Sequence, residues 1–492
     1  MSTNEGALPL PGSATEPVAK TGSTAAAPRL FSWPTMAFMT IAATGSMAQL
    51  SASAEFGLGA ITLYLLPAIF FLLPVALVAA ELATGWKGGV FVWVREGLGN
   101  RLGFQAQWLQ WVQSVALYPS LLSFAAASLA YTFGDESLAS NGLFNAAVIL
   151  IIFWGATLVA MRGVSASALI ASRGMLVGTL VPAVALVLLG VIWLGSSHHS
   201  SQTEISLGSV VPPWAGLASI VLIVSNFIAF AGLEVNAVHV RQMQNPGRGY
   251  PKALALAGVT IVLMYMLGSI AIAVVVPKSA INLNAGAAQA FTLFTTGFGI
   301  PWLGQLLSAL LTVGILAAAV SWVAGPSRGL LNVGREGYLP PALQRVNAAG
   351  VQAPILVVQG CIVTVLALAF VFLPSVTSAF WMLQAMTAIL YLTMYVIFFS
   401  AAARLRRRHP EVERAFRVPA LPLFATVGTL AALSAIFIAF IPPAQFGNDS
   451  VLKYAATLLI GVIILGGAGQ LLFQLRKPSW QTATTLPDDP EA

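Results

Sequence analysis

A glutamate and a glycine lie in the middle of a long apolar stretch of this chain. The stretch covers residues 214–240 and contains Phe230, Ala231, Gly232 and Glu234. An ionisable side chain at membrane depth is costly and marks a functional site by default. Glycine weakens a helix because its backbone loses the most conformational entropy on ordering. The combination indicates an acid placed beside a break in a membrane-spanning helix.

Two roles fit Glu234. It could be a gating or proton-sensing acid that takes up a proton when the site closes or when the outside is acidic. It could instead be a structural acid that accepts hydrogen bonds from backbone freed at the break and never titrates. A Glu234→Gln substitution separates these roles, because only the first predicts that the pH dependence of transport is lost.

A second polar interruption lies about ten residues inside the apolar stretch 34–55, at Thr44, Gly45 and Ser46. Transporters built from inverted repeats break two equivalent helices near the bilayer midplane, where the freed backbone groups bind substrate. The spacing of Gly45 and Gly232 fits that pattern. The alternative is that both are small residues that allow two helices to pack closely.

Further polar and aromatic residues could line a path through the membrane. The stretch 103–133 carries Gln110, Gln113, Ser114 and Tyr118 at helical spacing, so they share one face. That face could line a substrate path or bond to neighbouring helices. Trp322 ends the stretch 297–322 and could line the path or be an interfacial anchor. Tyr391, in the stretch 378–403, is a further candidate for the pocket.

Several kinds of chemistry are excluded. His198, His199, His239 and His409 have no Cys, Asp or Glu at ligand spacing, so no metal site is expected. No glycine-rich segment ends in the Gly-Lys-Ser/Thr of a nucleotide-binding loop. The single cysteine, Cys361, allows no disulfide. We expect no cofactor, no enzymatic activity and no direct ATP hydrolysis.

Composition sets the elements that must position these residues. The chain has 492 residues, 58% of them hydrophobic and 8% charged, and a mean hydropathy of +0.86. These values predict an all-α polytopic membrane protein. Residues 1–30 and 478–492 are expected to be cytosolic tails around a twelve-helix domain at 31–477. The twelve helices are expected near residues 34–55, 58–84, 103–133, 143–161, 168–194, 214–240, 252–276, 297–322, 353–373, 378–403, 419–441 and 452–475.

The distribution of positive charge predicts the orientation. Of the 23 Lys and Arg residues, only Lys278 and Lys453 fall in segments that face outward if the amino terminus is inside. Loops rich in Lys and Arg stay in the cytosol. Both termini are therefore expected in the cytosol, in the cell's inner (cytoplasmic) membrane. In that orientation the basic cluster 404–408 lies beside lipid headgroups at the cytosolic face. Cytosolic Lys and Arg then account for the net charge of +7, and no nucleic acid is expected as a partner.

Three segments together resemble the amino acid–polyamine–organocation (APC) superfamily, most closely its bacterial glutamate/γ-aminobutyrate antiporter branch. They are Phe230 to Glu234 with the following 245–251 loop, residues 74–94, and residues 321–341. The resemblance covers roughly residues 34–475. It implies the LeuT-like fold, a five-plus-five inverted repeat with broken helices 1 and 6 and with helices 11 and 12 outside the repeat.

The resemblance also implies roles for individual residues. Thr44, Gly45 and Ser46 match the segment that holds the substrate's carboxylate and amine, and Phe230, Ala231 and Gly232 match the second break. Gln113 and Ser114 match pocket positions, Glu234 matches a gating or pH-sensing acid, and Trp322 matches an aromatic gate. The implied activity is exchange of amino acids or amines by alternating access, with Phe230 and Trp322 closing the site in turn.

Two departures limit what carries over. Ala48, Gln49 and Leu50 stand where the glutamate/γ-aminobutyrate antiporter has aromatic and acidic residues, so a different substrate is expected. The tail after Lys477 has 15 residues, too few for the carboxy-terminal plug of acid-resistance antiporters. The nearest rival is a proton-coupled symporter or uniporter on the same fold. The residues of the chain do not support an intramembrane enzyme or a channel. The oligomeric state does not follow from the sequence.

Overall fold

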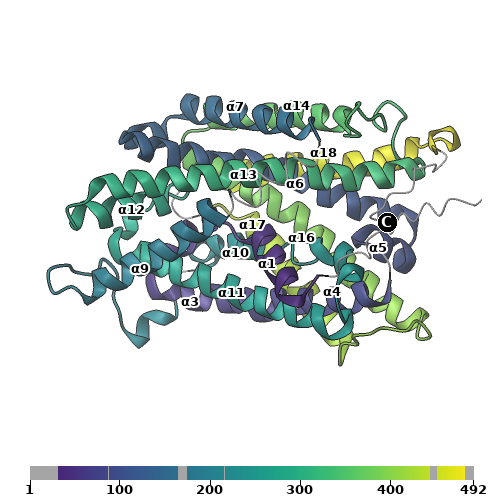
Figure 1. The fold of residues 1–492 in the computed structure, drawn as a ribbon, viewed down its shortest axis with the longest axis horizontal. Helices are drawn as coiled ribbons and strands as arrows, with labels where there is room; N and C mark the ends of the chain where they lie inside the picture. The colour runs from purple at the N-terminus through teal and green to yellow at the C-terminus, as the bar shows by residue number, and fades with distance from the viewer. Residues whose placement is uncertain are drawn as a thin grey trace, which may run out of the picture.

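Nearly all of the described chain is helical, and most helices run along the long axis of the molecule (Figure 1). The computed structural model describes residues 31–86, 88–163, 174, 176–214, 216–443 and 451–482. The tail expected at 1–30, the start of the helix expected at 168–194 and most of the tail expected at 478–492 lie outside these residues.

Eleven segments of the described chain are long and apolar enough to cross a membrane. They are Gly57–Gly85, Asn100–Phe133, Gly142–Ala160, Val177–Gly195, Leu217–Val240, Pro246–Val275, Pro301–Tyr338, Ala353–Phe372, Val376–Arg408, Leu421–Ala439 and Val451–Leu475. The prediction of a multi-pass all-α membrane protein is therefore confirmed. The expected first helix, 34–55, is not among the eleven, because it is divided into pieces that are each shorter than a span.

The first half of the chain contains that divided segment. Its elements are α1 (Trp33–Thr44), η1 (Met47–Gln49), α2 (Leu50–Ala54), α3 (Ala60–Pro67), η3 (Ala68–Leu72), α4 (Leu73–Gly85), α5 (Val90–Leu98), α6 (Asn100–Phe133), α7 (Gly142–Ala160), η5 (Leu176–Leu180), α9 (Val181–Gly195), α10 (Val224–Phe230) and η9 (Val235–Gln242). α1 starts at an N-cap, where Ser32 Oγ accepts a hydrogen bond from the Thr35 N–H and Pro34 occupies the first turn.

The second half consists of longer helices. They are α11 (Pro246–Val275), α12 (Gly286–Gly297), α13 (Pro301–Val333), η11 (Gly334–Tyr338), α14 (Ala353–Ala367), α15 (Ala369–Phe372), α16 (Val376–Arg408), α17 (Leu421–Ala439), α18 (Val451–Leu475) and η13 (Pro478–Trp480). In Figure 1, α6 and α13 run along the middle of the molecule, with α7 and α14 on one side and α3, α4 and α11 on the other.

α6 is the central helix of the bundle. It packs along both α13 and α16. The most apolar part of α6 is 89% buried, whereas that of α18 is 17% buried. Burial on all sides explains why α6 tolerates glutamine, serine and tyrosine: these side chains meet protein and not lipid. α18, in contrast, presents most of its apolar surface to the membrane.

A proline in the second span frees a carbonyl that a neighbouring helix uses. Pro67 has no N–H, so the Leu63 carbonyl loses its partner within the helix. Asn226 of α10 donates to that carbonyl at 2.9 Å through Nδ2. The helix continues after Pro67 as the π-helical turn η3. A buried asparagine on α10 thus joins the sixth span to the second.

Three expectations about the elements are wrong. The helix expected at 297–322 continues to Val333 as α13, with Pro326 inside it. The short helices α5 and α12 were expected to be loops. Trp322 consequently lies within α13, well before its end, and not at an interfacial terminus.

Glu81, near the end of α4, is the centre of a buried ion cluster. Its Oε2 accepts hydrogen bonds from Arg406 Nη1 and from the Val418 N–H at 2.7 Å. Arg414 Nε lies 3.3 Å from Glu81 Oε1, with side chains of Arg414 and Glu81 that are 2% and 1% exposed. Arg95, although close to Glu81 in the sequence, bonds to Glu336. The cluster ties the second span to the segment after α16.

The described part of the carboxy-terminal tail packs against η11. The Thr482 N–H donates to the Arg335 carbonyl at 3.2 Å. Gln344 Nε2 donates to the Trp480 carbonyl at 2.7 Å. Residues 480–482 are therefore hydrogen-bonded to the helical bundle.

Candidate functional site

The first apolar segment is interrupted at Gly45 and Ser46. α1 ends at Thr44, and both following residues have extended backbone, with ψ angles of 116° and 127°. The Ser46 N–H, which would continue the helix by bonding to the Ala42 carbonyl, donates to Tyr265 Oη at 3.0 Å. The same Tyr265 hydroxyl donates to the Thr44 carbonyl at 2.8 Å. One buried tyrosine therefore satisfies two of the backbone groups that the break exposes.

The sixth apolar segment is interrupted at Ala231 and Gly232. α10 ends at Phe230, Ala231 is extended, and Gly232 has φ +101°. Side chains with a Cβ rarely adopt that backbone conformation, so glycine is the residue that suits this position. The Gly232 N–H donates to Tyr395 Oη at 2.7 Å. A tyrosine hydroxyl again binds the exposed backbone.

The two interruptions lie against each other. A Cβ atom added to Gly232 would lie 3.3 Å from Thr44 Cγ2. Asn236, one turn after the second break, places its Nδ2 3.5 Å from Thr40 Oγ1 of α1. The two breaks, which are far apart in the sequence, thus lie side by side in the bundle. Their backbone groups without helical partners are in one place.

A cavity of about 80 Å³ opens beside this junction. That volume holds on the order of five to eight waters at about 10–15 Å³ each, the scale of a small amino acid or amine. None of the described residues that line it carries a charge. They are Ala42, Ala43, Thr44, Gly45, Ser46, Met47, Gln49, Gln113, Leu117, Leu121, Phe124, Gly178, Thr179, Ile228, Ala229, Ala231, Leu311, Gly314, Ile315, Ala318, Trp322 and Tyr391.

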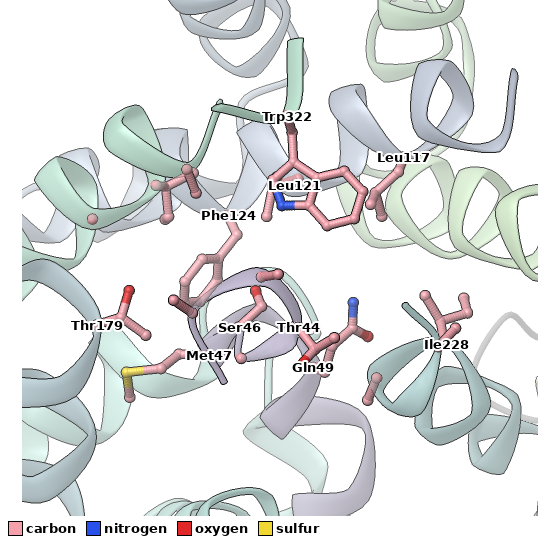
Figure 2. Close-up of a pocket in the computed structure, with 18 of the residues that line it drawn as sticks. Thr44, Ser46, Met47, Gln49, Leu117, Leu121, Phe124, Thr179, Ile228 and Trp322 are labelled. Carbon is pink, nitrogen blue, oxygen red and sulfur yellow. The ribbon is translucent and has the colours of Figure 1, made fainter. Parts of the chain in front are cut away.

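Figure 2 shows how the walls are arranged. The indole of Trp322 projects from α13 toward the broken segment that carries Thr44 and Ser46. Leu121 and Phe124 of α6 also line the cavity. The walls are mostly apolar. Thr44, Ser46 and Gln49 of the broken segment supply polar side chains, and Gln113, Thr179 and Tyr391 supply others from α6, η5 and α16.

Two glycines set the distance between η5 and α13 at the cavity wall. A Cβ on Gly178 would lie 2.2 Å from the Gly314 backbone N, and a Cβ on Gly314 would lie 2.4 Å from the Gly178 carbonyl oxygen. Backbones this close exclude any side chain at either position. The contact holds Thr179, the residue after Gly178, in the cavity lining.

Comparison with known proteins agrees with this geometry. The amino acid permease family matches residues 31–465 of the chain. The chain belongs to this family. An uncharacterized transporter of Legionella pneumophila subsp. pneumophila is 33% identical over 435 residues, which cover 87% of this permease and 93% of the relative.

Two further relatives carry names that describe their substrates. A glutamate/γ-aminobutyrate antiporter of Lactococcus lactis subsp. lactis is 30% identical over 422 residues, 84% of each chain. A probable agmatine/putrescine antiporter of the same organism is 26% identical over 424 residues, 82% of this permease and 86% of the relative. Membership of the amino acid permease family makes the protein a transporter and not an enzyme.

The structure places seven of the predicted site residues in the cavity wall of this permease: Thr44, Gly45, Ser46, Gln113, Ala231, Trp322 and Tyr391. Four others lie outside the wall. Ser114 Oγ donates to the Trp111 carbonyl at 2.6 Å. The Phe230 ring lies 6.1 Å from the rings of both Tyr64 and Tyr265, behind the first break. Gly232 and Glu234 lie behind Tyr391.

Glu234 is held by two tyrosines of α16. Tyr391 Oη donates to Glu234 Oε1 at 3.0 Å, and Tyr395 Oη donates to Oε2 at 2.5 Å. Glu234 is 1% exposed. Because Tyr391 lines the cavity, a single side chain separates the carboxylate from the space where a substrate fits.

Gln113 presents an unused acceptor. Its Nε2 donates to the Gln110 carbonyl at 3.2 Å, but its Oε1 has no partner among the described residues. Gln113 is 1% exposed and lines the cavity. A buried amide oxygen without a partner is costly, so it favours a donor from a bound molecule.

The sequence analysis missed four residues of the site. Gln49 lines the cavity, and its Oε1 accepts a hydrogen bond from Gln384 Nε2 at 2.8 Å. A signal existed for Gln49, since it is a polar residue three positions after Ser46. Thr179 also lines the cavity, and Tyr265 and Tyr395 bind the breaks. No signal identified those three, because nothing in the sequence marked which face of η5, α11 and α16 points inward.

Proposed function

We propose that this permease is a secondary active antiporter that exchanges a small amino acid for another amino acid or an amine by alternating access. The observation that carries the proposal is the cavity at the junction of the two broken segments. Residues of both breaks, Gly45, Ser46 and Ala231, line it, and its lining side chains are uncharged. Backbone at such breaks can bind the carboxylate and ammonium that all amino acids share. The antiporter names of two relatives support exchange.

Each end of a zwitterion has a binding partner in this proposal. The carbonyl end of α1, at Ala42, Ala43 and Thr44, carries the negative end of the helix dipole and suits an ammonium group. The Ser46 N–H suits a carboxylate oxygen, which would replace Tyr265 Oη as its acceptor. Backbone therefore supplies the recognition common to all substrates.

The remaining walls set the choice of substrate. Gln113 Oε1 accepts a hydrogen bond, so it favours a substrate with a distal N–H or O–H donor. Leu117, Leu121 and Phe124 make the rest of the wall apolar, and an unpaired second carboxylate there would be buried at high cost. The expected substrate is a small neutral amino acid or a monoamine.

Gating involves three of the predicted residues. Trp322 closes the cavity from the α13 side, and Phe230, packed on Tyr64 and Tyr265, is the opposing gate. Glu234 is the gating or proton-sensing acid and senses the cavity through Tyr391. The two gates close in turn as one bundle rocks against the other.

The proposed topology has twelve spans. α1, η1 and α2 together form the first, broken span, which precedes the eleven other candidates. Spans 1–5 and 6–10 form the LeuT-like inverted repeat, with the broken spans 1 and 6 leading each half. Both termini lie in the cytosol and the chain in the cell's inner (cytoplasmic) membrane, as the placement of Lys and Arg supports.

Counterflow in liposomes tests the proposal. Purified permease is reconstituted into vesicles loaded with unlabelled amino acids or amines, and uptake of the labelled compound is compared with uptake by empty vesicles. Exchange predicts much faster uptake into loaded vesicles. Equal rates with and without internal substrate would exclude an antiporter.

A proton-coupled symporter or uniporter is the second candidate. The observation that favours it is the buried Glu234 carboxylate one side chain from the cavity. Under this alternative, an imposed pH gradient drives accumulation into empty vesicles, and a protonophore abolishes it. Under exchange, the pH gradient alone drives no accumulation.

A further inference from the structure

A proline removes one hydrogen bond of α13 at Trp322. Pro326 lies inside α13 and has no N–H, so the carbonyl four residues earlier, that of Trp322, has no partner within the helix. Tyr118 of α6 donates to this carbonyl through Oη at 2.6 Å. Tyr118 is fully buried. A side chain of the central helix therefore replaces the missing helical bond.

The same turn of α13 receives donors from two other groups. Ser327 Oγ donates to the Val323 carbonyl at 2.7 Å and to the Ala324 carbonyl at 3.0 Å. Gln352, the residue before α14, donates through Nε2 to the Ala324 carbonyl at 3.0 Å and to Ser327 Oγ at 2.8 Å. The weakened turn is thus held by side chains from both sides.

This turn carries the indole that faces the cavity. The residues of α13 that line the cavity are Leu311, Gly314, Ile315, Ala318 and Trp322, all on one face of the helix. Trp322 is the last of them before Pro326. Figure 2 shows its ring directed toward the broken segment. A change of helix direction at the turn would therefore move the wall of the cavity at this residue.

We propose that the turn 322–326 is a hinge for the Trp322 gate and that Tyr118 is the positioning residue that holds the hinge closed. The proposal rests on the proposed function for the role of Trp322, while its mechanical part concerns α13 alone. The alternative is that Tyr118 only satisfies a buried carbonyl and has no influence on the gate.

Hydrogen–deuterium exchange of the purified protein tests the mechanical part without any substrate. Tyr118→Phe should accelerate exchange in peptides covering the turn about 2- to 10-fold, the effect expected for one net hydrogen bond. Pro326→Ala restores the N–H that Trp322 lacks, so adding Tyr118→Phe to Pro326→Ala should change exchange by less than about 1.5-fold. Equal acceleration by Tyr118→Phe in both backgrounds would overturn the proposal, as would no acceleration.

Tyr250→Phe is the matched control. Tyr250 is a fully buried tyrosine whose hydroxyl has no partner among the described residues, so its removal should leave exchange in the turn unchanged. If Pro326→Ala does not fold, the comparison of Tyr118→Phe with Tyr250→Phe decides. Faster exchange in the turn of Tyr118→Phe but not of Tyr250→Phe supports the hinge. Equal exchange in the two variants refutes it.

Transport by the same variants tests the link to the gate. Tyr118→Phe should raise the KM for exchange about 2- to 10-fold at unchanged maximal rate, because a loosened gate releases substrate faster. Pro326→Ala should remove this effect. A fall in maximal rate at constant KM would overturn the link. If the wild type exchanges no amino acid or amine, the proposed function fails, whereas the deuterium result still decides the hinge.

Discussion

Tyr391 donates its hydroxyl hydrogen to Glu234 across 3.0 Å while its ring side lines the cavity. Glu234 itself does not reach the cavity wall. Its second oxygen accepts from Tyr395, which also accepts from the Gly232 N–H. The carboxylate is therefore connected both to the space for substrate and to the backbone of the second break.

This connection predicts that Glu234→Gln flattens the pH dependence of transport. Glutamine keeps the size of the side chain and accepts one tyrosine hydrogen bond, but it cannot take up a proton. Initial rates of exchange in liposomes at several pH values measure the effect. Glu411→Gln, at an exposed glutamate after α16, should retain the wild-type profile. A Glu234→Gln profile identical to that of the wild type would leave only the structural role for this acid.

Gly232→Ala should abolish or strongly reduce transport. Alanine at φ +101° is strained by about 1–3 kcal/mol, and its Cβ would lie 3.3 Å from Thr44 Cγ2. The break would shift against the first span. Gly155→Ala, where a Cβ meets no atom within 4 Å, controls for the added methyl group. Transport rates together with thermal unfolding in detergent check both variants, and normal exchange by Gly232→Ala would contradict the role of the break.

Tyr265→Phe should lower stability and strengthen substrate binding. It leaves the buried Thr44 carbonyl and Ser46 N–H without their partner, at a cost of about 1–3 kcal/mol in unfolding free energy. A substrate that uses the same groups no longer competes with the tyrosine. Substrate should therefore raise the melting temperature more in this variant than in the wild type. Equal increases would mean that substrate binds elsewhere.

Glu81→Gln should destabilise the fold far more than a surface change does. It leaves Arg414, 2% exposed, and Arg406 without their carboxylate, and an unpaired buried charge costs about 3–5 kcal/mol. Glu96→Gln removes an exposed partner of Arg95 and should cost less than about 1 kcal/mol. Thermal unfolding of both variants measures the difference. Similar melting temperatures would show that the cluster does not support the fold.

Local composition marked both glycines as candidate breaks, and the family resemblance favoured breaks over close helix packing. Gly45 and Gly232 each lie beside polar residues within an apolar stretch. This pattern can be recognised from a few neighbouring residues, without knowledge of the rest of the chain. The extent of α13 was not predictable in the same way. Its Gly325-Pro326-Ser327 turn resembles a helix end, and Tyr118 and Gln352, which are distant in the sequence, bond to its carbonyls.

The cavity lining was predictable only in part, because it too depends on contacts between residues that are distant in the sequence. Gln113 and Tyr391 stood out as polar residues in apolar helices. Phe230 was expected in the lining, but its ring is turned toward Tyr64 and Tyr265. Which face of an apolar helix points inward depends on its neighbours, and apolar spans carry little periodicity that reveals it.

The contact between Gly178 and Gly314 limits how this carrier can be re-engineered. Replacing either residue would wedge two backbones apart, so the pocket cannot be reshaped from that wall without separating the helices that enclose it. Room for a bulkier cargo has to come from trimming Leu117, Leu121 or Phe124 on the opposite helix. A library that varies those three positions and leaves the glycine pair untouched is the rational start for changing what the protein carries.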